Sequence, residues 1–294
     1  MSRSFDLQGH RGARGLFPEN TLEGFAATLA IGVDSIELDV ALTADGVVVV
    51  SHDPALNPDL TRGPDGRWLV PATPLIRSLT LAELRRYDVG RLRPGSDYAR
   101  RFPEQRPRDG ARIPTLSEVF ALTRPAHVRV SVEVKVPQGQ AEQGIPLASA
   151  VIETADAAGA RGLFDIRSFD WRPLRHVRQR HPEVPLTWLT DASSFPAGEA
   201  PAAVVAEAHA GAMGRWRPAW APVHAQLTPA LLAQAQGLGL AVVPWTVNET
   251  LAMTRLIAWG VDGLCTDRPD VARRAMTAAG LTPPGISRSS GSSP

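Results

Sequence analysis

Apolar runs that suit β-strands alternate along the chain with apolar positions at helical spacing. The strand-like runs are short, rich in Val, Leu and Ile, and bounded by polar or turn-forming residues. We predict strands at 5–10, 34–42, 46–53, 126–136, 162–168, 184–190, 240–247 and 261–266. We predict helices at 20–32, 80–90, 115–123, 146–159, 172–180, 228–239, 248–260 and 268–276.

This alternation is typical of βα units arranged around a parallel sheet. Several predicted helices end at a glycine, which suits the left-handed C-cap conformation; these are Gly32, Gly159, Gly239 and Gly260. About eight units in one chain favour a closed barrel over an open doubly wound sheet. The first strand is also not followed by the GxGxxG motif of dinucleotide-binding folds. We therefore predict an α/β protein with a TIM (β/α)₈ barrel.

One long segment, residues 54–113, interrupts the alternation. It is rich in Pro, Gly and Arg, and an unstructured connection of that length is unusual inside a compact domain. We predict an insertion after an early strand that caps one end of the barrel. Residues 1–280 are then one barrel domain that includes the insertion, and the polar segment 281–294 is predicted to be a disordered tail.

Composition and charge narrow the class of protein. With 44% hydrophobic and 21% charged residues the chain is typical of globular proteins, and its net charge of +1 gives no bulk attraction to nucleic acid or anionic membranes. No run reaches the ~18 apolar residues of a membrane span, and we expect no stable membrane insertion. The single cysteine, Cys265, excludes an intrachain disulfide, and the first residues contain no apolar secretory segment. We expect a cytoplasmic enzyme; its oligomeric state stays open.

Polar side chains gather on one face of two predicted strands. Glu37 and Asp39 share a face of "SIELDV", and Glu133 and Lys135 share a face of "VRVSVEVKV" opposite five valines. Inside a barrel, buried carboxylates are costly unless they are paired or bind metal, and three of them suit Ca²⁺ or Mg²⁺. The alternatives are an ordinary ion pair between Glu133 and Lys135, the only lysine, and an exposed strand face for Glu37 and Asp39.

Two histidines stand where predicted strands end. His10 ends the first strand and is followed by Arg11, and His52 ends the third strand. One imidazole can take a proton from a nucleophile while the other protonates a leaving oxygen, and nearby cations can hold phosphate oxygens. His10 and His52 are therefore acid/base candidates. The other histidines have no such cluster around them and are expected to be structural.

The string from residue 9 to 53 resembles the glycerophosphodiester phosphodiesterase family. The matching elements are His10-Arg11-Gly12, Pro18-Glu19-Asn20-Thr21, Glu37-x-Asp39, Thr43-x-Asp45-Gly46 and His52-Asp53. Later blocks that are similar to the family follow in the same order: "SVEVK" (131–135), "SFDW" (168–171), "PWTVN" (244–248) and "DGLCTDRPD" (262–270). The resemblance runs from about residue 6 to 277. Arg167 and Cys265 depart from the family's pattern, and neither is expected to take part in the reaction.

The resemblance implies one divalent metal, Ca²⁺ or Mg²⁺, on Glu37, Asp39 and Glu133, with His10 and His52 as the acid/base pair. It further implies that phosphate is contacted by Arg11 and Lys135, and that Trp245 lines the glycerol or leaving-group side; core packing is the alternative for Trp245. The implied reaction is attack of the glycerol 2-hydroxyl on phosphorus, followed by opening of the cyclic phosphate by water. The products are glycerol 3-phosphate and an alcohol such as choline or ethanolamine.

Two other functions remain compatible with these residues. The same groups acting on a lysophospholipid would release its headgroup, as a lysophospholipase D does, and would need an apolar groove for the acyl chain. The insertion offers apolar candidates for such a groove: Trp68, Leu69, Val70, Leu75, Ile76 and Leu79. The third possibility is an inactive barrel that only binds phosphorylated ligands. Loss of activity usually removes a histidine or a carboxylate, and none is missing here.

Overall fold

Eight parallel strands form a nearly closed barrel at the centre of the molecule. The computed structural model describes residues 5–136, 139–194, 198–209 and 217–285. The barrel strands are β1 (Asp6–His10), β2 (Ser35–Leu42), β4 (Arg129–Val134), β5 (Phe164–Ser168), β6 (Leu186–Thr190), β7 (Ala219–Pro222), β8 (Ala241–Val242) and β9 (Gly263–Thr266). They are hydrogen-bonded in the order β8-β7-β6-β5-β4-β2-β1-β9. Asp262 N donates to Val242 O (2.9 Å) and Cys265 N to Pro244 O (3.0 Å) across the gap between β8 and β9. The predicted TIM-barrel fold is confirmed.

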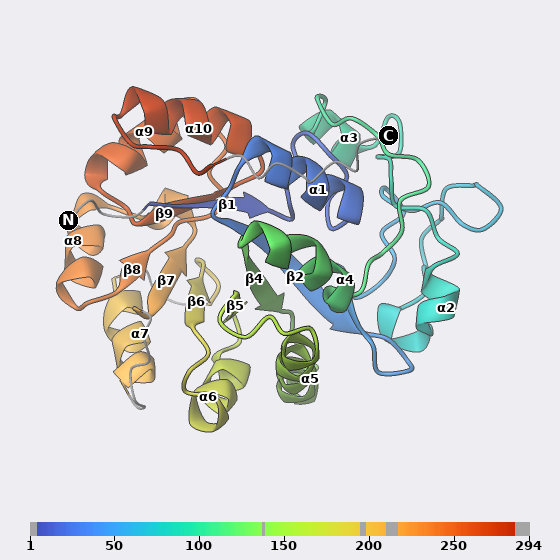
Figure 1. The fold of residues 1–294 in the computed structure, drawn as a ribbon, viewed down its shortest axis with the longest axis horizontal. Helices are drawn as coiled ribbons and strands as arrows, with labels where there is room; N and C mark the ends of the chain where they lie inside the picture. Colours follow the sequence, from blue (N-terminus) through green and yellow to red (C-terminus); the bar gives the residue numbers. More distant parts are fainter. Residues whose placement is uncertain (1–4, 137–138, 195–197, 210–216, 286–294) are drawn as a thin grey trace.

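Helices surround this barrel, as Figure 1 shows. They are α1 (Leu22–Ile31), α4 (Leu116–Thr123), α5 (Gly144–Ala157), α6 (Trp171–Arg180), α7 (Ala200–His209), α8 (Pro229–Gly237), α9 (Thr250–Trp259) and α10 (Pro269–Ala278). The glycines predicted to end helices all have positive φ, between 61° and 92°; they are Gly32, Gly159, Gly239 and Gly260. At these positions a side chain would be strained, which is why glycine ends the helix.

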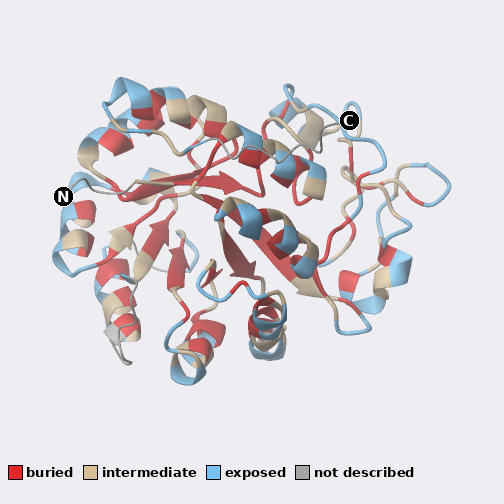
Figure 2. Ribbon diagram, viewed as in Figure 1, coloured by how far each residue is buried: buried red, intermediate tan, exposed pale blue. Residues whose placement is uncertain are grey.

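The main core lies between the strands and the helices. Val130, Val132 and Val134 of β4 are fully buried in it, together with Phe120 of α4 and Val151 of α5. Figure 2 shows the strands as buried and the outer faces of the helices as exposed. Because alternate residues of a strand face opposite sides, the valines on the outside of β4 leave its polar residues facing the barrel interior.

The strand count differs from the prediction in two places. The predicted strand at 46–53 exists as β3 (Val48–Val50), but it folds back and pairs antiparallel with β2 outside the barrel order. The eighth barrel strand is instead β7, which was not predicted, and neither was α7 before it. The four residues of β7, "AWAP", include a proline and two alanines, so they carry almost no strand pattern. Parallel pairing with β6 and β8 is what holds them in the barrel.

The segment between β3 and α4 forms a layer with its own small core. It contains the 3₁₀ helix η1 (Ile76–Ser78) and the helices α2 (Leu81–Leu84) and α3 (Asp97–Arg101). Leu56, Ile76, Leu84 and Ile113 pack around Val49 of β3, which attaches this layer to the barrel. In Figure 1 it extends to the right, beside α1 and α4.

The helix predicted at 80–90 is shorter in the structure. Helix α2 runs only from Leu81 to Leu84; its N-cap is Thr80, whose side chain and that of Glu83 form a capping box. Beyond it, Asp88 exchanges two backbone hydrogen bonds with Arg62, of 2.8 and 3.0 Å. This pairing uses backbone groups that a longer helix would have needed for itself.

The end of the described chain packs on the barrel without regular structure. Leu281 contacts the main core, and Arg273 donates a hydrogen bond of 2.6 Å to Pro284 O. The rest of the predicted disordered tail, 286–294, lies outside the described residues. Within the described part of the chain, every helix is too short or too polar to span a membrane.

Candidate active site

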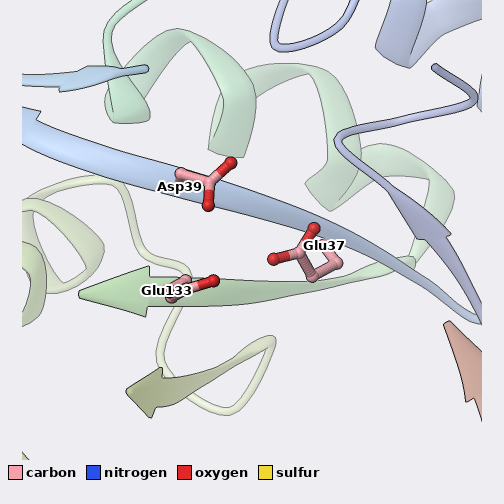
Figure 3. Close-up of side chains that lie close together, drawn as sticks. All are labelled: Glu37, Asp39 and Glu133. Atoms are coloured by element: carbon pink, nitrogen blue, oxygen red, sulfur yellow. The ribbon is translucent and has the colours of Figure 1, made fainter. Parts of the chain in front are cut away.

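Three buried carboxylates lie close together on β2 and near the carboxyl end of β4 (Figure 3). Glu37 and Asp39 lie on the same face of β2, and Glu133 is the register partner of Asp39 on β4. One oxygen atom from each of the three lies within 4.8 Å of the others. Their exposed fractions are 2%, 1% and 6%, so the alternative of an exposed strand face for Glu37 and Asp39 is wrong.

Two cations lie against these carboxylates. Lys135 Nζ is 2.7 Å from Glu133 Oε1 and 3.2 Å from Asp39 Oδ1, and Arg11 Nε is 3.3 Å from Asp39 Oδ2. Burial alone would raise the pKa of Asp39, but Lys135 and Arg11 outweigh it and hold that pKa well below its ordinary value. The Glu133–Lys135 pair therefore exists, but as part of a larger charged cluster.

Glu37 is the member of the cluster that lacks full charge compensation. Burial and the neighbouring charge of Asp39 both raise its pKa, and the Arg11 backbone N–H donates to its Oε2 at 3.1 Å. A cation beside the three oxygens would remove this repulsion, and carboxylate oxygens are the donors that hard divalent cations prefer. The residues present therefore fit a Ca²⁺ or Mg²⁺ site.

His10 reaches the cluster from the end of β1. Its Nε2 is 3.8 Å from Glu37 Oε2, and its Nδ1 is 2.6 Å from Asp267 Oδ1. Burial lowers the pKa of His10 to about 4, although Asp267 acts in the opposite direction. A carboxylate only accepts hydrogen bonds, so the proton of the neutral ring sits on Nδ1. The lone pair of Nε2 is then free on the side of the carboxylates.

Asp267, which holds His10, was not recognised from the sequence. It also accepts hydrogen bonds from Arg14 Nε (2.9 Å) and Asn248 Nδ2 (2.7 Å). Burial alone would raise the pKa of Asp267, but His10 and Arg14 outweigh it and keep the carboxyl ionised. Asp267 stands in the "DGLCTDRPD" block, yet no local pattern could indicate a partner 257 residues away.

We expect Asp267→Asn to lower kcat by about 10²-fold or more and to change KM little. The amide can present an N–H to His10 Nδ1, which would place the ring proton on Nε2 and remove the basic lone pair. Steady-state kinetics on the purified variant test this. Asp270→Asn lies in the same segment, and its carboxylate forms ion pairs with Arg268 and Arg274; it is the matched control and should retain wild-type kcat. Equal kcat values for the two variants would contradict the role of Asp267.

His52 approaches from the loop after β3 and is more exposed than His10. Its side chain is 32% exposed against 10% for His10. Its Nδ1 is 2.7 Å from Asp53 Oδ1, and Asn57 Nδ2 donates to the other oxygen of Asp53 at 2.7 Å. Each histidine is therefore held through Nδ1 by a carboxylate. His10 lies deep in the site, and His52 lies at its rim.

A cavity of about 480 Å³ connects these groups at the carboxyl end of the barrel. Seven of the eight predicted site residues line it: His10, Arg11, Glu37, His52, Glu133, Lys135 and Trp245. The eighth, Asp39, is held just behind by Arg11, Lys135 and Asn20. Trp245 donates to Ala221 O at 2.9 Å and packs edge-on against Phe169, with ring centres 5.3 Å apart. Trp245 thus forms a wall of the cavity.

The two departures from the family blocks line this cavity as well. Both residues are thus near the site, and the expectation that neither takes part in the chemistry stays a prediction. Arg167 is the register partner of Glu133 on β5, is only 1% exposed, and donates to Gln8 Oε1 at 2.7 Å. Residues of a strand face opposite sides in turn, so the sequence alone could have placed Arg167 on the inner face of β5. A buried guanidinium there adds a third positive charge next to the three carboxylates.

The insertion completes the cavity wall through α3. Tyr98 donates to Glu19, accepts a hydrogen bond of 3.1 Å from Arg14, and lines the cavity. Glu19 in turn accepts from Arg11 NH1 at 2.9 Å. Other insertion arginines pair with acidic groups of the same segment, such as Arg62 with Asp88 and Asp109.

The chain matches the model of the glycerophosphoryl diester phosphodiesterase family over residues 10–271. It is 30% identical to a glycerophosphodiester phosphodiesterase of Caldanaerobacter subterraneus, covering 89% of this chain and 93% of that protein. It is also 30% identical to one from Bacillus subtilis, covering 89% of this chain and 83% of that protein.

Solved structures show the same likeness. A Silicibacter pomeroyi protein assigned to this family superposes with a TM-score of 0.88 at 35% identity, covering 96% of each chain. An Oleispira antarctica phosphodiesterase, solved in complex with sn-glycerol-3-phosphate, shares the fold with a TM-score of 0.72 at 23% identity, covering 92% of this chain and 96% of that one.

Proposed function

Because the chain belongs to the glycerophosphoryl diester phosphodiesterase family, we propose that it hydrolyses glycerophosphodiesters to glycerol 3-phosphate and an alcohol. The observation that carries this proposal is the cavity itself. It combines a buried carboxylate cluster with two histidines, each held by its own carboxylate, and with two cations. Cleavage of a phosphodiester requires two proton transfers and stabilisation of negative charge on the phosphate, and these groups can provide both.

Glu37, Asp39 and Glu133 would hold one divalent cation, Ca²⁺ or Mg²⁺. When bound, such a cation polarises oxygen atoms of the substrate and neutralises charge that develops on them. Arg11 and Lys135 would contact the non-bridging phosphate oxygens. Both already lie beside the carboxylates, and both line the cavity. Trp245 would contact the apolar face of the glycerol.

The different surroundings of the two histidines support a different task for each. Neutral His10 presents the Nε2 lone pair and would take the proton of the glycerol 2-hydroxyl as its oxygen bonds to phosphorus. His52 at the rim would protonate the alcohol oxygen as its bond to phosphorus breaks, leaving a cyclic glycerol phosphate. In the second step His52 would take a proton from water as it attacks phosphorus, and His10 would return its proton to the 2-oxygen.

The test is hydrolysis of glycerophosphocholine by the purified protein, followed by phosphorus NMR for the phosphates and by proton NMR for choline. We expect equimolar glycerol 3-phosphate and choline, a transient cyclic phosphate, loss of turnover with EDTA, and recovery with added Mg²⁺ or Ca²⁺. Undiminished turnover in EDTA would contradict the proposed dependence on a divalent metal. Binding of the diester without any cleavage would contradict the enzymatic function in favour of a binding barrel.

A cytoplasmic location is likewise a proposal. It is supported by Cys265, the only cysteine, which is fully buried and cannot form an intrachain disulfide.

A further inference from the structure

An apolar groove adjoins the cavity at His52. It encloses about 640 Å³, a volume within the usual range for small-molecule sites. The end of β2, the insertion and the beginning of α5 form its walls. Its apolar lining residues are Val40, Ala41, Leu42, Pro54, Leu75, Ile76, Val136, Pro146 and Leu147. Glycerol, choline and ethanolamine are too polar or too small to require such a surface.

The groove and the catalytic cavity share part of their lining. His52, Asp53 and Lys135 line both, whereas His10 lines only the cavity. The histidine at the rim therefore stands at the junction, with the carboxylates on one side and the apolar walls on the other. A substrate whose phosphate lies between Arg11 and Lys135 can extend past His52 into the groove.

The insertion contributes two of the six apolar residues considered for such a surface. Leu75, which is 37% exposed, and Ile76 line the groove. The others are used elsewhere or point away: Leu69 and Leu79 pack in the core of the insertion, the Trp68 ring lies 5.8 Å from the Arg62 guanidinium, and Val70 is 69% exposed outside the groove.

We propose that this groove binds an alkyl chain carried by the leaving alcohol, so that alkyl esters of glycerol phosphate are a favoured substrate class. The inference rests on the proposed function, because it takes His52 as the proton donor to the leaving oxygen. The glycerol then lies on the side of His10 and the carboxylates, and the substituent of the leaving oxygen continues past His52. Each buried methylene contributes up to about four-fold in kcat/KM.

The experiment compares the methyl, butyl and octyl esters of glycerol 3-phosphate. We expect kcat/KM to rise by about 10²-fold from methyl to octyl, below the additive limit because part of the chain stays in contact with water. Leu75→Asp places a charge in the groove and should remove most of this rise while leaving turnover of the methyl ester unchanged. The matched control is Leu238→Asp at the end of α8, a leucine of similar exposure (39%) outside the groove, which should keep the full rise.

Binding in EDTA tests the groove separately from catalysis. Calorimetric titration should give a lower Kd for the octyl ester than for the methyl ester with the wild type, and nearly equal values with Leu75→Asp. Equal Kd and kcat/KM along the series in the wild type would overturn the groove assignment. A lysophosphatidylcholine that outcompetes the octyl ester would also overturn it, because its chain is attached to the glycerol side. Failure to cleave any ester would contradict the proposed function, and the Kd series would still decide the groove.

Discussion

Replacing Glu37 with glutamine is expected to lower kcat by at least about 10³-fold and to weaken divalent-metal binding by at least about 10-fold. Of the three carboxylates that are the candidate metal ligands, Glu37 lies closest to His10. Its negative charge is also the least compensated by neighbouring cations. Glutamine has the same shape as glutamate and keeps an oxygen that accepts the hydrogen bond from the Arg11 backbone N–H, so the surrounding backbone should stay in place. Calorimetry with Mg²⁺ and Ca²⁺ measures the affinity, and glycerophosphocholine turnover measures the activity.

The same variant gives a readout that does not depend on activity. Removing the charge of Glu37 relieves repulsion from Asp39 and Glu133, so in EDTA its thermal midpoint should equal or exceed that of the wild type. Added metal should then raise the midpoint of the wild type more than that of the variant. Glu153→Gln, an exposed position on α5, is the control and should match the wild type in every measurement. A variant that binds metal normally would show that Glu37 is not a ligand.

Replacing either His10 or His52 with alanine should lower kcat on glycerophosphocholine by at least about 10²-fold, the usual scale for removal of an acid or base. The two variants should differ with a p-nitrophenyl ester of glycerol phosphate, because nitrophenolate departs without a proton. In the first step, His52→Ala should recover most of its rate on that ester, and His10→Ala should not, since its substrate hydroxyl must still lose a proton. Opening of the cyclic phosphate should stay slow in His52→Ala, because His52 also takes the proton from the attacking water. Single-turnover release of nitrophenolate, followed beside the conversion of the cyclic phosphate, measures this difference.

Two outcomes would contradict the assignment. Recovery of the first step in His10→Ala alone would exchange the two roles, and recovery in neither would mean that His52 does more in the first step than protonate the leaving oxygen. His176→Ala is the control: this histidine lies on α6, outside the cavity, and the variant should behave as the wild type on both esters.

The sequence predicts the fold and the carboxylate cluster well because both follow from short-range patterns. Glu37 and Asp39 share a face simply because they are two residues apart on a strand, and the valines of β4 identify its outer side in the same way. Once the fold is a barrel, Glu133 must also point inward.

The rest depends on contacts between distant segments. Asp267 has no local signal, because its partner His10 lies at the other end of the chain. The strand β7 exists only through its pairing with β6 and β8. The apolar groove depends on how the insertion packs against β2, and residues such as Leu69 and Leu75 cannot be told apart before that packing is known.

The hydrogen bond between His10 and Asp267 joins the first barrel strand to the loop after the last. During translation the residues of β1 leave the ribosome long before the carboxylate that orients the histidine, which is made 257 residues later. Partly synthesised chains that already contain Glu37, Asp39, His52 and Glu133 therefore still lack a correctly held His10. With His10 as the proposed base, nascent chains would not cleave diesters at full rate before barrel closure, and the appearance of activity would report that the last strand has docked.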